Sequence, residues 1–296
     1  MAGSETAATA RTLILPKLRA YWTLLKSAQT GLLLVTGLAG YVSGHPRTPT
    51  WPDILALLGS LFLAVGGSTV LNMVIDRDID AQMRRTARRP LPSGVVSAEE
   101  GTVIGLVMAF CGVFWAMHLA FLYGVLIFAG LFFDVVIYTW WLKRRTPWSI
   151  LWGGLAGGMP VLAGRALATG YVDVTGVLLA LAVLFWIPTH ILTFSIKYAG
   201  DYAHAGVPVF PNRYGTRVTR WLIAFSTGAA ALVMLWAVYR IGVPPALLWI
   251  ARGLGGVLVG FTLVSAVHNA PKLNYMLFKL ASLYMLGSML LLIAGA

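Results

Sequence analysis

The sequence predicts an all-α, polytopic membrane protein with nine transmembrane helices. Hydrophobic residues make up 58% of its 296 residues, charged residues only 11%, and the mean hydropathy is +0.80. Soluble domains carry about 25% charged residues, so this composition is typical of a chain embedded in lipid. Two further patterns support the prediction: apolar runs of spanning length recur along the chain, and Lys and Arg gather in alternate connections.

Composition also bears on other classes of protein and other kinds of site. The net charge of +12 does not indicate nucleic acid as a partner, because most of the excess falls in loops on one side of the membrane. The single cysteine, Cys111, excludes an intrachain disulfide and a cysteine-based metal cluster. The first 20 residues do not read as a cleaved signal peptide, so the first span is expected to act as its own insertion signal.

Nine apolar runs are long enough to cross a bilayer core, which needs about 20 helical residues. The third and fourth runs are separated by almost nothing around residues 119–121, which predicts a tight helical hairpin. We expect residues 1–20 to form a cytoplasmic N-terminal segment and residues 21–296 a single domain. The nine predicted spans are 24–44, 53–75, 101–119, 122–142, 148–168, 174–196, 218–240, 245–267 and 274–294.

Helix start signals agree with this division. Ser97 with Glu100 three residues later predicts a capping box before the third span. Thr146 and Pro147 predict an N-cap and a first-turn proline before the fifth. Pro244–Pro245 and Pro271 mark the starts of the last two spans.

The positive charges predict the orientation of the chain. An N-terminus inside the cell leaves only Arg47, Arg165, Arg240 and Arg252 for the outside or for burial. Every other Lys and Arg is then cytoplasmic, which is the distribution that the positive-inside rule favours. We therefore expect a multi-pass protein of the plasma membrane with its C-terminus outside and the connections at about 76–100 and 197–217 on the cytoplasmic side.

The stretch NMVIDRDIDAQMRRTARRPLPSG, residues 72–94, carries three aspartates and five arginines directly after a span. If the helix continues, Asn72, Asp76 and Asp80 stand one turn apart and line one face, whereas Asp78 points elsewhere. Two carboxylates and an amide oxygen are hard ligands of the kind that Mg²⁺ takes together with substrate phosphate. Positive-inside bias alone explains the arginines but not these carboxylates, so we interpret the stretch as a metal and diphosphate site.

A second constellation lies in residues 186–215, WIPTHILTFSIKYAGDYAHAGVPVFPNRYG. His190, Phe194, Lys197 and Asp201 share a helix face if the sixth span continues to Asp201. Lys197 can contact phosphate as a point charge, and Asp201 remains for Mg²⁺. Because both constellations follow an inward-running span, they indicate an internal repeat. His190 is either a hydrogen-bonded histidine of the bundle, or an acid–base group, an acceptor-orienting donor or an axial haem ligand.

Asp134 lies inside the fourth span, with Tyr138 one turn later. An ionisable group in a membrane is a candidate for a site, but a structural partner such as Arg165, a tyrosine or a neighbouring helix amide is an equal alternative. The complete set of predicted site residues is catalytic Asp76, Asp80, Lys197, Asp201 and His190; metal-binding Asp76, Asp80, Asp201 and Asn72; and substrate-binding Asn72, Lys26, Arg84, Arg88, Arg89, Asp134, Tyr138, Lys143 and Tyr202.

These motifs resemble those of the UbiA superfamily of intramembrane prenyltransferases, whose first motif, NxxxDxxxD, matches Asn72, Asp76 and Asp80. The stretches NMVIDRDIDAQMRRTARRPLPSG, YTWWLKRRTPWSILWGGLAGGMPVLAG and KYAGDYAHAGVPVFP are similar to its haem O synthase (protoheme IX farnesyltransferase) branch. Aromatic-acceptor branches usually carry a second DxxxD, from which Lys197 and Asp201 depart in the direction of the haem O branch. The resemblance runs from about residue 20 to the C-terminus.

The resemblance implies a nine-helix bundle around a central cavity and Mg²⁺-dependent transfer of a farnesyl group from its diphosphate to the vinyl group of haem b. Prenylation of an aromatic quinone or lipid precursor is the alternative within the same class. A transporter is the alternative from another class, but transport sites lie near the midplane, whereas these acids gather at helix ends. A non-catalytic haem-binding subunit has no need of the carboxylate motif. Prenyl length, the number of Mg²⁺ ions and the oligomeric state do not follow from the sequence.

Overall fold

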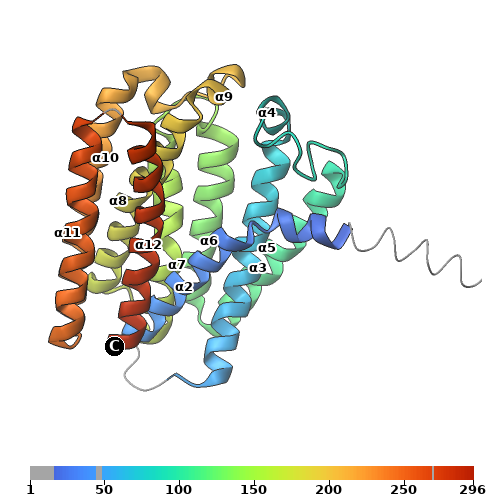
Figure 1. Ribbon diagram of the computed structural model, residues 1–296. Coiled ribbons are helices and arrows are strands. Elements are labelled where there is room, and N and C mark those ends of the chain that lie inside the picture. Colours follow the sequence, from blue (N-terminus) through green and yellow to red (C-terminus); the bar gives the residue numbers. More distant parts are fainter. Residues whose placement is uncertain (1–16, 45–48, 269) are drawn as a thin grey trace, which may run out of the picture.

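The computed structural model describes residues 17–44, 49–268 and 270–296, and within these ranges it contains helices and no strand (Figure 1). Most of the predicted N-terminal segment, residues 1–16, lies outside the described residues. A short helical stretch, residues 17–24, precedes the first long helix. The helices that follow are α2 (Ser27–Gly44), α3 (Trp51–Ile75), α4 (Arg77–Gln82), α5 (Ala98–Leu119), α6 (Phe121–Leu131), the π-helix η1 (Phe132–Leu142), α7 (Ser149–Thr169), α8 (Val174–Lys197), α9 (Ala199–His204), α10 (Phe210–Ile241), α11 (Pro245–Val267) and α12 (Pro271–Gly295).

Membrane-spanning length and apolarity confirm the predicted fold class. In the described part of the chain, eight helices are long and apolar enough to cross a bilayer, with α6 and η1 forming one continuous span, Phe121–Leu142. Helix α2 occupies the predicted first span but is not among the eight. It has 18 residues, and Gly, Ser and Thr interrupt its apolar sequence.

The long helices form a closed ring. Each one packs against its successor along the chain, from α2 and α3 round to α11 and α12, and α12 packs back against α2. Further contacts, among them α2 with α7, α8 with α12 and α3 with η1, join helices that are far apart in the sequence. The short helices α4 and α9 lie together at one end of this bundle, the end opposite the C-terminus (Figure 1).

Helices α2 and α7 cross at glycines. A Cβ atom on Gly40 would lie 2.0 Å from the carbonyl oxygen of Val161, and one on Gly164 would lie 2.0 Å from that of Gly37. Neither position admits a side chain, so the two backbones are in direct contact. Small residues at crossings are the usual means of helix association in lipid, where apolar surface alone gives no preference for another helix.

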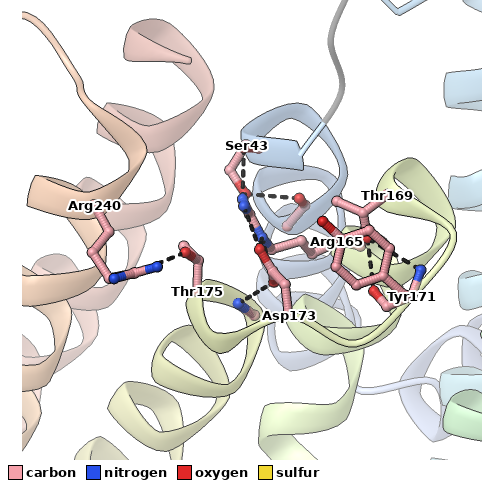
Figure 2. Close-up of polar contacts among 9 residues, drawn as sticks. Ser43, Arg165, Thr169, Tyr171, Asp173, Thr175 and Arg240 are labelled. Carbon is pink, nitrogen blue, oxygen red and sulfur yellow. Dashed lines mark hydrogen bonds and ion pairs between the residues drawn. The ribbon is translucent and has the colours of Figure 1, made fainter.

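At the end of the bundle away from α4 and α9, Arg165 joins three helices (Figure 2). Its guanidinium donates to both carboxylate oxygens of Asp173, at 2.8 to 2.9 Å, and to the carbonyl oxygen of Ser43 at 2.6 Å. Asp173 also caps α8 by accepting from the backbone N–H of Gly176 at 2.7 Å. This cluster ties the last turn of α2, the end of α7 and the start of α8 together.

Most of the predicted helix start signals are confirmed. Ser97 caps α5 by accepting from the Glu100 N–H, and Ala120 alone separates α5 from α6. The reciprocal half of the capping box is absent among the described contacts, because Glu100 bonds Tyr21 and Lys17 of the 17–24 stretch instead. The predicted start signal of the fifth span was wrong: α7 begins at Ser149 with Trp148 as its N-cap, so Thr146 is not the N-cap and Pro147 is not in the first turn.

Candidate active site

Two helices that carry the sequence motifs break at the same end of the bundle (Figure 1). Helix α3 ends at Ile75 and α4 begins at Arg77, with Asp76 between them at φ −84° and ψ 1°. Helix α8 ends at Lys197 and α9 begins at Ala199, with Tyr198 between them at φ −113° and ψ 25°. Each half of the chain thus presents a long helix, one non-helical residue and a short helix, which is the form that the predicted repeat takes.

Apolar packing holds the two breaks together. Ile79 and Met83, on and just after α4, pack in one cluster with Val207 and with Tyr202 of α9. The apolar contacts of Ile79, Met83 and Val207 therefore bring the two helix breaks to a common region.

The one-turn register of the first motif survives the break. The backbone N–H of Asp76 donates to the Asn72 carbonyl at 2.9 Å, and that of Asp80 donates to the Asp76 carbonyl at 2.8 Å. Because these are i to i−4 bonds, the three side chains stay one turn apart as the sequence predicted, although the helix is not continuous.

Asp76 is buried and forms an ion pair with Lys143 at the end of η1. Burial by itself would lower the pKa of Lys143, but the Asp76 carboxylate, with Tyr138 and Tyr202, raises it. The second carboxylate oxygen of Asp76, Oδ1, is buried and has no hydrogen-bond partner among the described residues. A buried anionic oxygen without a donor is costly, so this atom is suited to a cation.

Asp80 is held by the loop that follows it. Arg89 Nη1 donates to Asp80 Oδ2 at 2.7 Å, and the hydroxyl of buried Thr86 donates to the Asp80 carbonyl oxygen at 2.8 Å. The arginine-rich segment therefore folds back over the carboxylates. Arg84 and Arg88, also predicted to bind substrate, are exposed on this loop and make no ion pair within the described part of the chain.

Asp78 faces away from the pair, as predicted. Both nitrogens Nη1 and Nη2 of Arg144 donate to its carboxylate at 2.6 Å. This hydrogen bonding lowers the pKa of Asp78 and keeps it ionised as one half of a surface ion pair. Its side chain is 59% exposed, so it has a structural role at most.

Asn72 and Asp134 belong to one buried network beneath the carboxylates. Asp134 Oδ2 accepts from Asn72 Nδ2 at 2.7 Å and from the Ser68 hydroxyl at 2.6 Å. The amide oxygen of Asn72 accepts from the Thr139 hydroxyl at 2.9 Å. Of the partners proposed for Asp134, a neighbouring helix amide is present and Arg165 is not, because Arg165 lies at the other end. Asp134 and Thr139 lie in the π-helix η1, a form often found at functional sites.

Lys26 completes the basic surroundings of the first motif. It stands in the turn between the 17–24 stretch and α2, with the left-handed backbone value φ 43° that side chains other than glycine rarely adopt. Burial, reinforced by the nearby positive charges of Arg89 and Lys143, lowers the pKa of Lys26 to about 8. The Nζ atom of Lys143 lies 5.7 Å from the ring centroid of Tyr138. Tyr202 also contributes to the raised pKa of Lys143.

The second constellation is not one continuous helical face, because α8 ends at Lys197. His190 stacks between Trp186 and Phe278, with ring centroids 5.0 and 4.5 Å away, and its Nδ1 is 3.2 Å from the Ser282 hydroxyl. Asp201 is half-buried on α9. Among the described residues no three His, Cys, Asp or Glu side chains gather to hold a metal ion, so Asp201 does not form one cluster with Asp76 and Asp80.

Lys197 lies in a cavity between α8 and α12. The cavity measures about 150 Å³ and is lined by Thr193, Phe194, Lys197, Tyr198, Tyr275 and Phe278. The Lys197 ammonium is 4.0 Å from the ring centroid of Tyr275 and 5.2 Å from that of Tyr198.

Several residues in this region escaped the sequence analysis. Ser68 stands one turn before Asn72, so extending the register of the first motif backwards would have found it. Thr139, Ser282 and Tyr275 carry no motif signal, because only helix packing brings them to Asn72, His190 and Lys197. Arg85 was counted with the loop charges, yet its guanidinium lies over the ring of Phe194, 4.7 Å from the centroid.

The model of the UbiA prenyltransferase family matches residues 33–283. The protoheme IX farnesyltransferase of Archaeoglobus fulgidus is 40% identical over 223 residues, which cover 75% of this chain and 78% of that protein. The same enzyme of Thermofilum pendens is 38% identical, with 88% of this chain and 93% of that protein covered. The similarity to these relatives shows that this chain is an enzyme of the protoheme IX farnesyltransferase type.

A solved structure of a UbiA homolog from Archaeoglobus fulgidus, described as bound to GPP and Mg²⁺, shares the fold. Its TM-score is 0.68 at 15% identity, and the match covers 93% of this chain and 99% of that one. At this identity the likeness shows the fold alone. Family model, relatives and fold agree with the carboxylates at the α3–α4 break: the chain belongs to the UbiA prenyltransferase family.

Proposed function

We propose that this enzyme transfers a farnesyl group, or a longer prenyl group, from its diphosphate to the vinyl group of haem b to form haem O. The observation that carries the proposal is the pair Asp76 and Asp80, buried one turn apart and surrounded by Lys143, Arg89 and Lys26. The choice of acceptor rests on the names of the relatives, which are protoheme IX farnesyltransferases.

The residues present fit a magnesium ion. Asp76 Oδ1 is buried without a partner in the described part of the chain, and Asp80 lies one turn further along. Mg²⁺ is commonly held by one or two carboxylates, with substrate phosphates and water completing its shell, so a third protein carboxylate is not needed. Asp76 and Asp80 are the proposed ligands, with Asn72 and Asp201 as the further predicted ones. When bound, the ion neutralises the charge that develops on the departing diphosphate.

The basic side chains bind and orient the diphosphate. Lys143 and Arg89 pair with the two carboxylates and can exchange these contacts for phosphate oxygens, while Lys26 adds a third charge. Arg84 and Arg88, which are exposed on the loop, are proposed to approach the diphosphate from there. Lys197, Asp201 and Tyr202 are proposed to complete the site from the second half of the chain.

In the proposed reaction the bond between the prenyl carbon C1 and its oxygen breaks, and the electron pair leaves with the diphosphate. The faces of aromatic side chains are proposed to stabilise the allylic cation that remains. The vinyl carbon of the acceptor supplies the electrons of the new carbon–carbon bond. Water then adds to the resulting cation and loses a proton, with His190 or Asp134 positioning that water.

We also propose that residues 21–296 form one domain in the plasma membrane. The carboxylates and the basic loops then lie on the cytoplasmic side, where a soluble prenyl diphosphate has access. The positive charges of the α4 and α9 connections support this orientation.

One assay tests the function. Purified protein receives labelled farnesyl or geranylgeranyl diphosphate with either haem b or 4-hydroxybenzoate, with Mg²⁺ or with EDTA, and the products are identified by mass. The proposal requires a product heavier than haem b by the prenyl group and one hydroxyl group, formed only with Mg²⁺. Prenylated 4-hydroxybenzoate without a haem product would assign the enzyme to the aromatic-acceptor alternative.

A further inference from the structure

Three cations gather around the α8–α12 cavity. Lys197 and Lys279 both lie over the ring of Tyr275, with their Nζ atoms 4.0 and 4.9 Å from its centroid. Arg85, from the loop after α4, covers the rings of Phe194 and Tyr198 on the α8 side, at 4.7 and 5.4 Å. Tyr275 is therefore shared by two ammonium groups that are contributed by different helices.

In the described part of the chain, no carboxylate pairs with these three cations. Arg85, Lys197 and Lys279 make no ion pair within the described ranges of the chain, and the cavity lining contains no Asp or Glu. Aromatic faces attract cations, but each contact at an exposed site contributes only about 0.5–1 kcal/mol. Two ammonium groups on one ring also repel each other. An anion bound beside them would offset that repulsion and accept charge-assisted hydrogen bonds.

The size and lining of the cavity select the kind of anion. About 150 Å³ is the volume of roughly five waters at about 30 Å³ each, which suits a short acid side arm. The absence of a lining carboxylate argues against a magnesium diphosphate here, because such a complex needs carboxylate ligands of the kind found at Asp76 and Asp80. A carboxylate ligand, in contrast, needs only cationic side chains for its binding.

An aromatic path leads from the cavity into the bundle. Phe278, which lines the cavity, lies 5.8 Å from Phe194 and 4.5 Å from His190 between ring centroids, and His190 stacks in turn on Trp186. A flat ring system with an acid arm can therefore place the arm among the cations and its face along these side chains.

We propose that the α8–α12 cavity binds a carboxylate of the prenyl acceptor, with Lys279 and Arg85 as its recognition residues and Tyr275 as the ring that positions Lys279. This assignment deepens the proposed function and rests on it: haem b carries two propionates, and one of them occupies this cavity. Lys197 also lines the cavity, but it is already proposed above as a contact of the diphosphate, so the test uses Lys279 and Arg85. Lys279 lies on α12 and has no assigned role in the metal and diphosphate site of the first motif.

The test measures KM for haem b and for farnesyl diphosphate in Lys279→Met and Arg85→Met. KM for haem b rises roughly tenfold or more in each variant, since a hydrogen bond to a charged group is lost, while KM for farnesyl diphosphate stays the same. Tyr275→Phe keeps both kinetic constants and Tyr275→Leu raises KM for haem b, because only the ring is needed. Lys272→Met, one exposed lysine earlier on the same helix, is the matched control and behaves as wild type.

A second experiment changes the substrate instead of the protein. Haem b dimethyl ester, which has no carboxylate, is a poor acceptor for the wild type and is used equally by Lys279→Met and wild type. Equal use of haem b and its dimethyl ester by the wild type overturns this inference while the proposed function stands. Failure of the wild type to prenylate haem b at all overturns the function itself.

A lipid headgroup is the other source of an anion. The assay in phosphatidylcholine nanodiscs, with and without phosphatidylglycerol, separates the two sources. A Lys279 effect that persists without anionic lipid supports the acceptor, and one that appears only with phosphatidylglycerol overturns the assignment.

Discussion

Burial distinguishes the aspartates of the first motif from each other. The side chains of Asp76 and Asp80 are 11% and 9% exposed, whereas that of Asp78, only two residues from either, is 59% exposed. The buried pair faces Lys143 and Arg89, and the exposed one binds Arg144 at the surface. Removing a charge from these residues therefore has different consequences for activity.

We expect Asp76→Asn and Asp80→Asn each to lower kcat/KM by at least about 10²-fold, because each loses several kcal/mol of transition-state stabilisation through the metal. Asp78→Asn is the matched control: it makes the same substitution at the exposed aspartate between them and retains near-normal activity. Initial rates across a Mg²⁺ titration measure the effect. Full activity in either buried-site variant at low Mg²⁺ would remove these two residues from the metal site.

His190 is the residue-scale test of the acceptor. Its ring is held by Trp186, Phe278 and the Ser282 hydroxyl, at a level of the bundle below Lys197. We expect His190→Ala to keep binding of the prenyl diphosphate and to lose transfer to haem b. Binding of labelled diphosphate and product formation are measured on the same preparation.

Ser282→Ala is the matched control for His190. It removes only the hydroxyl that bonds Nδ1, so it should slow transfer less than His190→Ala does. If His190→Ala still prenylates haem b at the wild-type rate, the histidine is a packed, hydrogen-bonded residue of the bundle. A haem Soret band that shifts in the wild type and not in the variant would identify it as an iron ligand.

At the scale of elements, the α2–α7 crossing positions Lys26, which directly precedes α2. Gly40 and Gly164 leave no room for a Cβ atom, whereas a Cβ on Gly31 of the same helix α2 meets nothing within 4 Å. We expect Gly40→Ala to lower the thermal midpoint of the detergent-solubilised protein by several degrees and Gly31→Ala to leave it unchanged or higher, since alanine favours helix. Equal midpoints for the two variants would show that α2 and α7 can move apart at this crossing without loss of thermal stability.

The Arg165–Asp173 pair makes a second prediction at this scale. Burial alone would raise the pKa of Asp173, but hydrogen bonds from Arg165 and the Gly176 N–H lower it. A lowered pKa in the folded state means that the contribution to stability is present above the unfolded pKa and is lost as pH falls through the folded value. The wild type should therefore lose stability on acidification more steeply than Asp173→Asn.

Arg165→Met leaves the Asp173 carboxylate without its partner and should destabilise the protein by about 3 kcal/mol. Thermal midpoints at pH 7 and at acid pH measure both effects. Arg240→Met is the control, because the bond of Arg240 to Thr175 is long, 3.4 Å, and peripheral (Figure 2). An Arg240→Met midpoint as low as that of Arg165→Met would mean that general loss of charge, not the clamp, lowers the midpoint.

At the scale of the whole molecule, the distribution of Lys and Arg predicts which end of the bundle faces the cytoplasm. In a Cys111→Ser background, Tyr171→Cys and Ser93→Cys place exposed thiols at opposite ends. We expect a membrane-impermeant maleimide added to intact spheroplasts to label position 171 and to label position 93 only after permeabilisation. The reverse pattern would place the carboxylates outside and contradict the orientation.

The sequence by itself determined the all-helical fold, the positions of the spans and the register of Asn72, Asp76 and Asp80. These features depend on hydropathy over about 20 residues and on the 3.6-residue helical period, both of which are local. The local register holds even where the α3 helix stops, because the i to i−4 hydrogen bonds continue through Asp76.

Only the tertiary structure decided which side chains meet. Lys143 reaches Asp76 across 67 residues, Asn72 reaches Asp134 across 62, and Tyr275 of the last helix receives Lys197 of α8. The breaks at Asp76 and Tyr198 likewise have no signal in the helical pattern. Pairings between helices follow from backbone contact at residues such as Gly40 and from the fit of neighbouring side chains, and neither property can be read from one segment alone.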